Sequence, residues 1–152
     1  MRCYTKRSDP PGQHSLPKTI SQSFGLSKTI YHLVERNLLW VELIALKALG
    51  VKNGDEVITQ AFNFIATVEA IIECGAKPIL VNIDETYNMC PIELKKLITK
   101  KTKAIIPVHM LGVSAKMDDI LQIAKEKKIP VLEDNCESMG AKYNNKYLGC
   151  LG

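Results

Sequence analysis

The chain has 152 residues, of which 46% are hydrophobic and 24% are charged, a balance typical of one domain with a buried core. Its formal net charge is +4, and residues 43–152 hold fourteen Lys and Arg against thirteen Asp and Glu. This nearly neutral composition excludes a strongly basic surface for nucleic acid on residues 43–152.

The five cysteines are widely spaced and include no C-x-x-C pair. This spacing favours reduced thiols over a disulfide framework or a metal site. No apolar run reaches the ~18 residues that a membrane span needs, and the N-terminus lacks the apolar core of a signal peptide. We therefore expect a cytoplasmic protein that binds neither a membrane nor nucleic acid, and we expect no metal.

Residues 1–42 show no regular pattern. They mix Pro, Ser, Gln and Lys, and a weak helical period begins only near Thr29. We expect an atypical N-terminal segment that is either disordered or translated out of frame.

From Leu43 onward, strand-like and helix-like segments alternate. Leu43–Leu49 is typical of the end of a helix, and Gly50 stops it. Strands are predicted at 56–60, 78–83, 104–108 and 130–133, helices at 64–74, 91–98 and 117–127, and a hairpin with an Asn-Asn tip at 143–147. Nearly continuous apolar strands between helices indicate an α/β fold with a mainly parallel sheet and helices on both faces.

The fourth predicted strand is followed directly by a cluster of carboxylates within Ile129–Glu137. In an open α/β sheet, ligands bind at the carboxyl ends of the strands. Asp134 is therefore better placed for chemistry than for packing, and it is our first candidate for a functional residue.

Several separate blocks of sequence occur in one order along residues 43–152 and resemble a known family. These blocks are Gly54–Ile58, Phe62–Thr67, Gly75–Pro78, Thr102–His109 and Glu133–Glu137, followed by Lys142-Tyr143 and Leu148-Gly149. Together they resemble the DegT/DnrJ/EryC1/StrS sugar aminotransferases, which are pyridoxal-phosphate enzymes of the aspartate aminotransferase fold. The resemblance implies that residues 43–152 correspond to the first half of the large domain of a pyridoxal-phosphate-dependent transferase.

The resemblance implies three cofactor-binding residues. Asp134 resembles the carboxylate that pairs with the protonated pyridine nitrogen, and the alternative is an acidic cap of a following helix. Phe64 resembles the aromatic residue that stacks on the cofactor ring, and the alternative is a core phenylalanine. Glu137 lies where relatives often carry Gln or His near the phenolic oxygen, and the alternative is a solvated acid. His109 ends the third strand and receives no catalytic role.

Two departures from the family are expected to matter. No lysine in the chain matches the family's catalytic lysine, which forms the Schiff base with the cofactor and would lie beyond Gly152. We therefore assign no catalytic residue, and we expect the 152-residue chain by itself to be inactive. In addition, Leu38–Trp40, or nearby residues, occupy the position of the small Gly-Thr/Ser-Ala/Ser element that cradles the cofactor phosphate in relatives.

A slip of the reading frame would explain the second departure. Tryptophan has the single codon TGG and valine codons begin with G, so Trp40-Val41 read one base later always gives a glycine codon. We hypothesise that residues 1 to about 41 are an out-of-frame translation, with ordinary divergence as the alternative. Resequencing the locus decides between them.

The activity that the resemblance implies is transfer of an amino group from glutamate to a nucleotide-linked keto-sugar, as a step of polysaccharide biosynthesis. The resemblance also implies that the full-length enzyme is a homodimer. A sugar dehydratase that uses pyridoxal or pyridoxamine phosphate is the alternative within the family. A non-catalytic α/β interaction module is the alternative from another class. A Rossmann nucleotide binder explains the βα rhythm, but no G-x-G-x-x-G follows any strand.

Overall fold

The computed structural model describes residues 38–152, which fall within one compact unit, Val34–Gly152. The expectations for residues 1–37, including the greater part of the proposed out-of-frame segment, lie outside this range. The first described element, helix α3 (Leu38–Ala48), begins before the predicted domain boundary at residue 43. None of the helices within residues 38–152 is long and apolar enough to cross a membrane.

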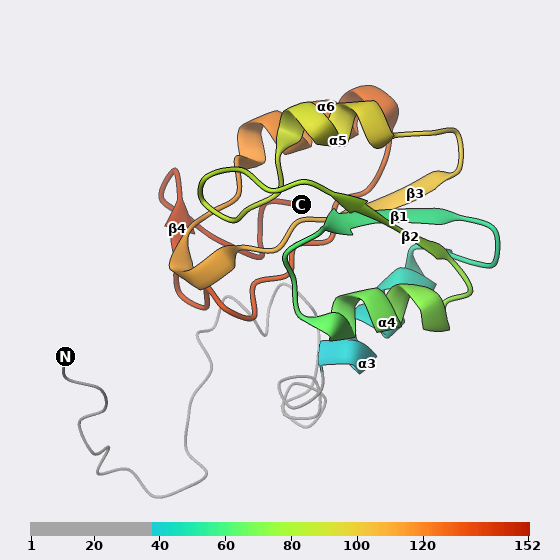
Figure 1. Ribbon diagram of the computed structural model, residues 1–152. Coiled ribbons are helices and arrows are strands. Elements are labelled where there is room, and N and C mark those ends of the chain that lie inside the picture. Colours follow the sequence, from blue (N-terminus) through green and yellow to red (C-terminus); the bar gives the residue numbers. More distant parts are fainter. Residues whose placement is uncertain (1–37) are drawn as a thin grey trace, which may run out of the picture. The chain divides into compact units, whose positions relative to one another are not determined.

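A parallel three-stranded sheet forms the middle layer (Figure 1). Its strands are β1 (Glu56–Gln60), β2 (Lys77–Val81) and β3 (Thr102–Ile106). The order is β2-β1-β3, and β1 pairs in parallel with both neighbours. The three predicted strands are confirmed, with ends shifted by up to two residues. Because the strands are parallel, the loops that follow them meet at one edge of the sheet.

The fourth predicted strand runs in parallel beside β3, but it makes only two isolated bridges, so the expectation of a regular fourth strand is wrong. The Leu132 N–H donates to the Ile105 carbonyl, and the Asp134 N–H donates to the Pro107 carbonyl, each with an N···O distance of 2.9 Å. A continuous ladder needs an N–H from residue 107 between these two bonds, and proline has none. Pro107 therefore interrupts the pairing next to Asp134 without moving the segment away from β3.

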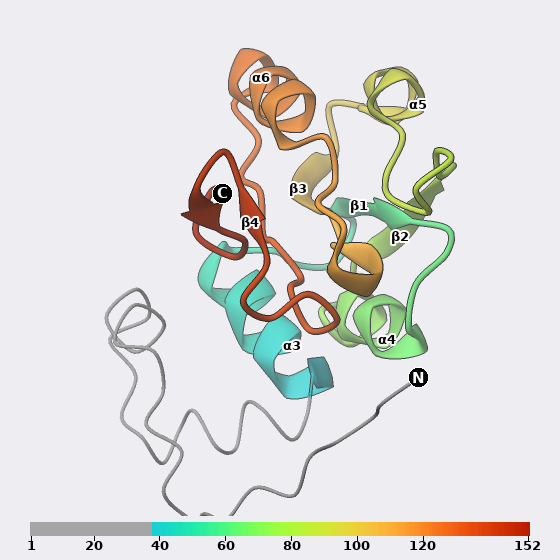
Figure 2. The ribbon, with the colours of Figure 1, turned by 90° about the vertical axis from the view of Figure 1, so that its left-hand side faces the viewer.

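Helices cover both faces of the sheet, as predicted (Figure 2). Helix α4 (Ile65–Glu73) packs with α3 on one face, while α5 (Pro91–Leu97) and α6 (Met117–Lys127) lie on the other. The hairpin is also confirmed, with strands β4 (Lys142–Tyr143) and β5 (Lys146–Tyr147). Its two tip residues, Asn144 and Asn145, have positive φ angles, as a tight two-residue turn requires.

Alternation along the strands divides the core into two clusters. Val57 packs with α3 and α4, while its neighbour Ile58 packs with α5 and α6. In β3, Ile106 joins the first cluster and Ile105 the second. Successive side chains of a strand point to opposite faces, so both faces of the sheet are apolar and both need a helical cover.

Gly75, which follows α4, is expected to be less replaceable than Gly50, which follows α3. Both have φ near +76°, but a Cβ on Gly75 would lie 3.3 Å from the Asn53 Cα, whereas Gly50 has no atom within 4 Å. We expect Gly50→Ala to lower the free energy of unfolding by about 1 kcal/mol and Gly75→Ala by roughly 2 kcal/mol. Urea unfolding of the two variants tests this, and equal losses would contradict the steric explanation.

Candidate functional site

The loops at the carboxyl edge of the sheet are held together by buried amide side chains. Gln60 lies at the end of β1, and its side-chain oxygen accepts a hydrogen bond from the Val108 N–H at a distance of 3.2 Å. Its side-chain nitrogen donates to the Phe62 and Tyr87 carbonyls, each at a distance of 3.1 Å. Asn88 accepts from the Met110 N–H over 2.9 Å. Because both amides are fully buried and their hydrogen-bonding groups are satisfied, they fix the loops relative to one another.

Asp134 lies at this edge and is only 5% exposed. Its Oδ1 accepts from the Cys136 N–H over 3.0 Å, so it caps a turn and not a helix. Its Oδ2 lies 3.5 Å from the Thr67 Oγ1 on α4, at the long limit of a hydrogen bond, and the Cys136 thiol also interacts with this carboxylate. Within residues 38–152, no Lys, Arg or His forms an ion pair with it. The carboxylate therefore keeps an oxygen available for a cationic donor.

Phe64 stands at the start of α4, three residues before Thr67, and therefore at the same edge as Asp134. Its side chain is 64% exposed, so the alternative of a core phenylalanine does not hold. Phe62 is also half exposed, and its ring centroid lies 5.4 Å from that of Tyr87. The structure thus leaves an accessible aromatic ring at the edge where the sequence predicts a stacking residue.

Glu137 lies in an exposed turn beyond Asp134. No helix begins there, so it is not an acid in the first turn of a helix. Its neighbour Cys136 is an exposed residue, but burial of the sulfur and the adjacent Asp134 raise the pKa of this thiol. The raised pKa favours the protonated thiol at neutral pH.

Glu42 is a second buried acid, which none of our expectations from the sequence singled out. It lies on α3, is 4% exposed, and burial followed by the charge of Asp134 raises its pKa to about 8. Glu42 is the only acid on α3, which also carries Lys47, but residue 42 fell within the segment that we expected to be disordered or out of frame.

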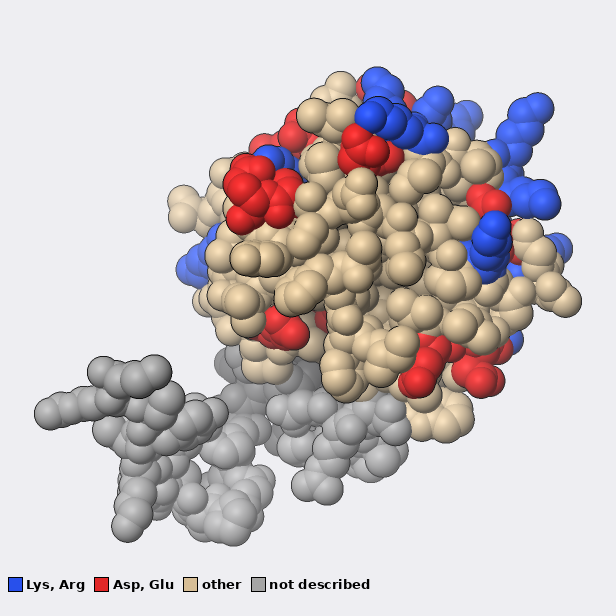
Figure 3. All heavy atoms as spheres, in the orientation of Figure 1, with Lys and Arg blue, Asp and Glu red and all other residues tan. Residues whose placement is uncertain are grey.

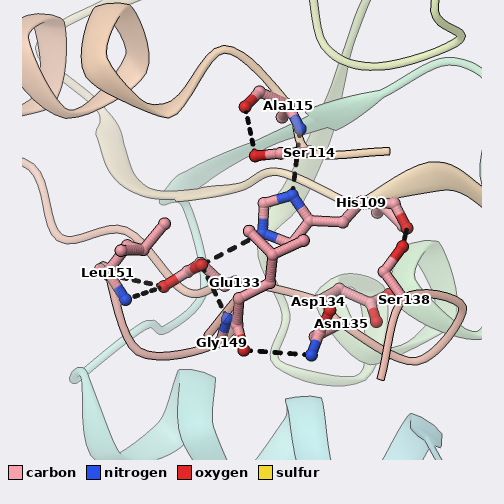
Figure 4. Close-up of polar contacts among 12 residues, drawn as sticks. His109, Ser114, Ala115, Glu133, Asp134, Asn135, Ser138, Gly149 and Leu151 are labelled. Atoms are coloured by element: carbon pink, nitrogen blue, oxygen red, sulfur yellow. Dashed lines mark hydrogen bonds and ion pairs between the residues drawn. The ribbon is translucent and has the colours of Figure 1, made fainter. Parts of the chain in front are cut away.

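Glu133, which precedes Asp134 in the extended segment beside β3, forms a buried polar pair with His109 (Figure 4). The Ala115 N–H donates to His109 Nδ1 at a distance of 3.1 Å, so Nδ1 is an acceptor and the ring proton lies on Nε2. The Nε2–H then donates to the Glu133 carboxylate, also at a distance of 3.1 Å. The Glu133 carboxylate also accepts from the backbone N–H groups of Gly149, Leu151 and Gly152.

This network holds the Glu133 carboxylate in its ionised form. Burial alone would raise the pKa of Glu133, but the donors from His109 and the three backbone groups hold it below the usual value. Glu133 and Asp134 are consecutive residues of an extended segment, so their side chains point to opposite sides. Fixing Glu133 therefore fixes the extended segment that carries Asp134, and His109 contributes to this through its hydrogen bond to Glu133.

Charged side chains do not form one continuous strip on the face shown in Figure 3. Lys and Arg gather at its upper and right margins, interleaved with Asp and Glu, while its middle is largely uncharged.

A family model for the DegT/DnrJ/EryC1/StrS aminotransferase family matches residues 42–152. The chain belongs to this family. The prediction made from its sequence blocks is therefore confirmed, and so is the fold class of a partial large domain of a pyridoxal-phosphate-dependent transferase.

Curated relatives include enzymes of sugar metabolism. The chain is 52% identical over 110 residues to a pleiotropic regulatory protein of Geobacillus stearothermophilus, covering 72% of this chain and 30% of the relative. It is 51% identical over 100 residues to UDP-2-acetamido-2-deoxy-3-oxo-D-glucuronate aminotransferase of Pseudomonas aeruginosa, covering 65% and 28%. The chain thus spans less than one third of the length of these relatives.

Solved structures of the family superpose well on the described fold. An aminotransferase from Psychrobacter cryohalolentis gives a TM-score of 0.74 at 35% identity, with 76% of this chain and 30% of that chain covered. GDP-4-keto-6-deoxymannose-3-dehydratase with a trapped PLP-glutamate geminal diamine gives 0.69 at 37% identity, with 74% and 31% covered. Pyridoxal phosphate is thus the cofactor of the family.

The residues of this chain fit the ring of that cofactor but not its phosphate. Asp134 offers a buried acceptor that has no cationic partner among residues 38–152, and Phe64 offers an accessible aromatic face. In contrast, Leu38–Trp40 forms the first turn of α3, and Leu39 packs into the core. Bulky side chains there keep the backbone amides away from a phosphate, so we derive no phosphate contact from this helix.

Proposed function

We propose that this chain carries the ring-binding part of the cofactor site of a pyridoxal-phosphate-dependent aminotransferase that acts on nucleotide-linked keto-sugars, with glutamate as the amino donor. The observation that carries the proposal is the state of Asp134. It is a buried carboxylate at the carboxyl edge of a parallel sheet, with one oxygen held by a backbone N–H and the other in only a long contact with the Thr67 hydroxyl, and it has no cationic partner among residues 38–152. The similarity to a UDP-sugar aminotransferase supports the substrate class.

Each of the three proposed site residues has a distinct role. Bound pyridoxal phosphate supplies an electron sink for the carbon that carries the amino group. Asp134 accepts the N–H of the pyridine ring and stabilises its positive charge. Phe64 orients the ring by stacking. Glu137 would face the phenolic oxygen, and its carboxylate would repel that oxygen unless one of the two groups is protonated.

A chimera tests the proposal. Residues 42–152 replace the corresponding segment of the Pseudomonas aeruginosa UDP-2-acetamido-2-deoxy-3-oxo-D-glucuronate aminotransferase, which supplies the rest of the enzyme. We expect the chimera to bind pyridoxal phosphate, seen as visible absorbance of the purified protein, and to aminate the host's substrate with glutamate. The 152-residue chain alone serves as the comparison, and we expect it to show neither property.

Two results would count against this function. A soluble, folded chimera without bound cofactor would show that the segment lacks a ring site. A lysine of the 152-residue chain that can be trapped with the cofactor by borohydride would show that the assignment of no catalytic residue is wrong.

The similarity to GDP-4-keto-6-deoxymannose-3-dehydratase makes a sugar dehydratase the second candidate. The family resemblance implies that a histidine takes the place of the catalytic lysine in such dehydratases. The genomic sequence downstream of the Gly152 codon separates the two candidates by the residue at that position.

A further inference from the structure

Thr67 places a buried hydroxyl group next to Asp134. It lies in the first turn of α4, three positions after Phe64, and the residue is 0% exposed. Its Oγ1 lies 3.5 Å from the Asp134 Oδ2, although 67 positions separate the two residues in sequence. A threonine hydroxyl in a helix often donates to a carbonyl of the preceding turn. Among residues 38–152 this hydroxyl makes no such bond, so it is directed toward the acid and not toward its own helix.

Hydrogen bonds that run to the sheet hold the start of α4 in place. The Thr59 hydroxyl on β1 donates to the Ile106 carbonyl on β3 at a distance of 3.0 Å. The Asn63 side-chain nitrogen donates to the Thr59 hydroxyl oxygen at 3.2 Å, and the Asn63 side-chain oxygen accepts from the Phe64 N–H. The Thr67 N–H donates to the Phe64 carbonyl at 3.3 Å and closes the first turn. Thr67 is therefore positioned from the sheet, through the start of its own helix.

The Thr67 hydroxyl is the donor to Asp134 that comes from another element. The Cys136 N–H donates to the Asp134 Oδ1 at 3.0 Å, and the Cys136 thiol also interacts with the carboxylate, but both groups belong to the turn that follows this acid. A contact from α4 on Oδ2 adds a second fixed point and opposes rotation of the carboxylate about its Cβ–Cγ bond. Since a carboxylate oxygen accepts more than one hydrogen bond, Oδ2 keeps a place for a further donor.

Glu42 is the acid that competes for the same hydroxyl. Burial raises the pKa of Glu42 to about 8, and the Thr67 hydroxyl acts against this rise. A hydroxyl has one proton and donates it to one acceptor at a time. Among residues 38–152, neither carboxyl oxygen of Glu42 has a partner at hydrogen-bond geometry, whereas the Asp134 Oδ2 does. The hydroxyl proton therefore belongs to the contact with Asp134.

We propose that Thr67 is a positioning residue for Asp134. Its hydroxyl fixes the rotation of the Asp134 carboxylate and ties the segment that carries this acid to α4, at whose start Phe64 lies. One contact thus sets the place of the acceptor for the ring nitrogen relative to the aromatic residue that stacks on the ring. This role toward the cofactor rests on the proposed function, whereas the hydrogen bond itself does not.

NMR of the 152-residue chain without cofactor tests the hydrogen bond. A buried, hydrogen-bonded hydroxyl proton exchanges slowly with water and gives a signal of its own. We expect such a signal for Thr67 in the wild-type chain, and we expect Asp134→Ala to shift or remove it and Glu42→Gln to leave it in place. The absence of this signal in the wild type, or a signal that Asp134→Ala leaves unchanged, would overturn the proposal.

Two variants of the chimera separate positioning from packing. Thr67→Val keeps the shape of the side chain and loses the hydroxyl, whereas Thr67→Ser keeps the hydroxyl and loses a methyl group. We expect Thr67→Val to lower kcat by about 3- to 10-fold, as for one neutral hydrogen bond, with KM for the host's sugar substrate unchanged. We expect Thr67→Ser to keep kcat within about twofold of the wild type. A packing role predicts the reverse order.

The matched control is Thr99→Val, which removes an exposed hydroxyl that donates to the carboxylate of Glu56 at the other edge of the sheet. It is expected to leave kcat within about twofold. A Thr67→Val kcat equal to that of this control, or a Thr67→Ser loss as large as that of Thr67→Val, would overturn the positioning role. Because the NMR experiment needs no cofactor, its result is separate from the chimera test of the proposed function.

Discussion

Replacing Glu133 with alanine is expected to lower the free energy of unfolding of this chain by roughly 3 kcal/mol. The substitution removes the acceptor of the His109 ring, whose side chain is fully buried, and of three backbone N–H groups near Gly152. Each buried donor without a partner costs about 1–3 kcal/mol, although water can reach part of the terminal backbone. Urea unfolding at pH 7 measures the loss.

The matched control is Glu126→Ala, an exposed acid on α6 that accepts a hydrogen bond from Gln122. It is expected to cost no more than about 0.5 kcal/mol. Because the network holds the pKa of Glu133 below 4.5, its contribution is present above pH 4.5 and is lost as the pH falls through the lower folded value. A Glu133→Ala loss no larger than that of the control would show that the pair with His109 does not anchor this strand.

Replacing Asp134 with asparagine in the chimera is expected to lower kcat by roughly 10³-fold, as for loss of one preorganised electrostatic group. An amide has the size of a carboxylate but cannot stabilise a positively charged ring nitrogen, so folding should survive while the chemistry fails. Steady-state amination of the host's UDP-sugar substrate measures the effect.

Asp119→Asn, an exposed acid in the first turn of α6, is the control for that substitution and is expected to leave kcat within about twofold, as for a surface change remote from the site. If Asp134→Asn retains wild-type kcat, then another group stabilises the ring nitrogen and Asp134 is only a turn cap for Cys136.

Local sequence signals predicted most of the fold. The limits of α6, Met117–Lys127, match the prediction to the residue, because acidic residues open the helix, lysines close it and apolar residues recur at helical spacing. The strand at 130–133 failed as a regular strand, since Pro107 acts on a neighbour 25 positions away in sequence. Such a pairing effect depends on which strands lie side by side, and a propensity along one segment does not contain it.

The candidate site was predicted only in part. Asp134 was singled out as a carboxylate directly after an apolar strand, and the structure buries it; its contact with the cofactor stays a prediction. Whether Phe64 and Glu137 contact the cofactor stays a prediction. The role of the Glu133–His109 pair depends on a contact across 24 positions of sequence, and no local pattern encodes such a contact.

The most direct test of the account is the protonation of the cofactor ring nitrogen beside Asp134. The chimera is loaded with pyridoxal phosphate labelled with ¹⁵N in the ring, and the ¹⁵N NMR shift is recorded at pH 7–8 for the Asp134 protein and for Asp134→Ala. We expect the shift of a protonated pyridinium in the first protein and that of a neutral pyridine in the second. A neutral pyridine shift in the Asp134 protein, or the same shift in both proteins, would contradict the role of Asp134 as the partner of the ring nitrogen.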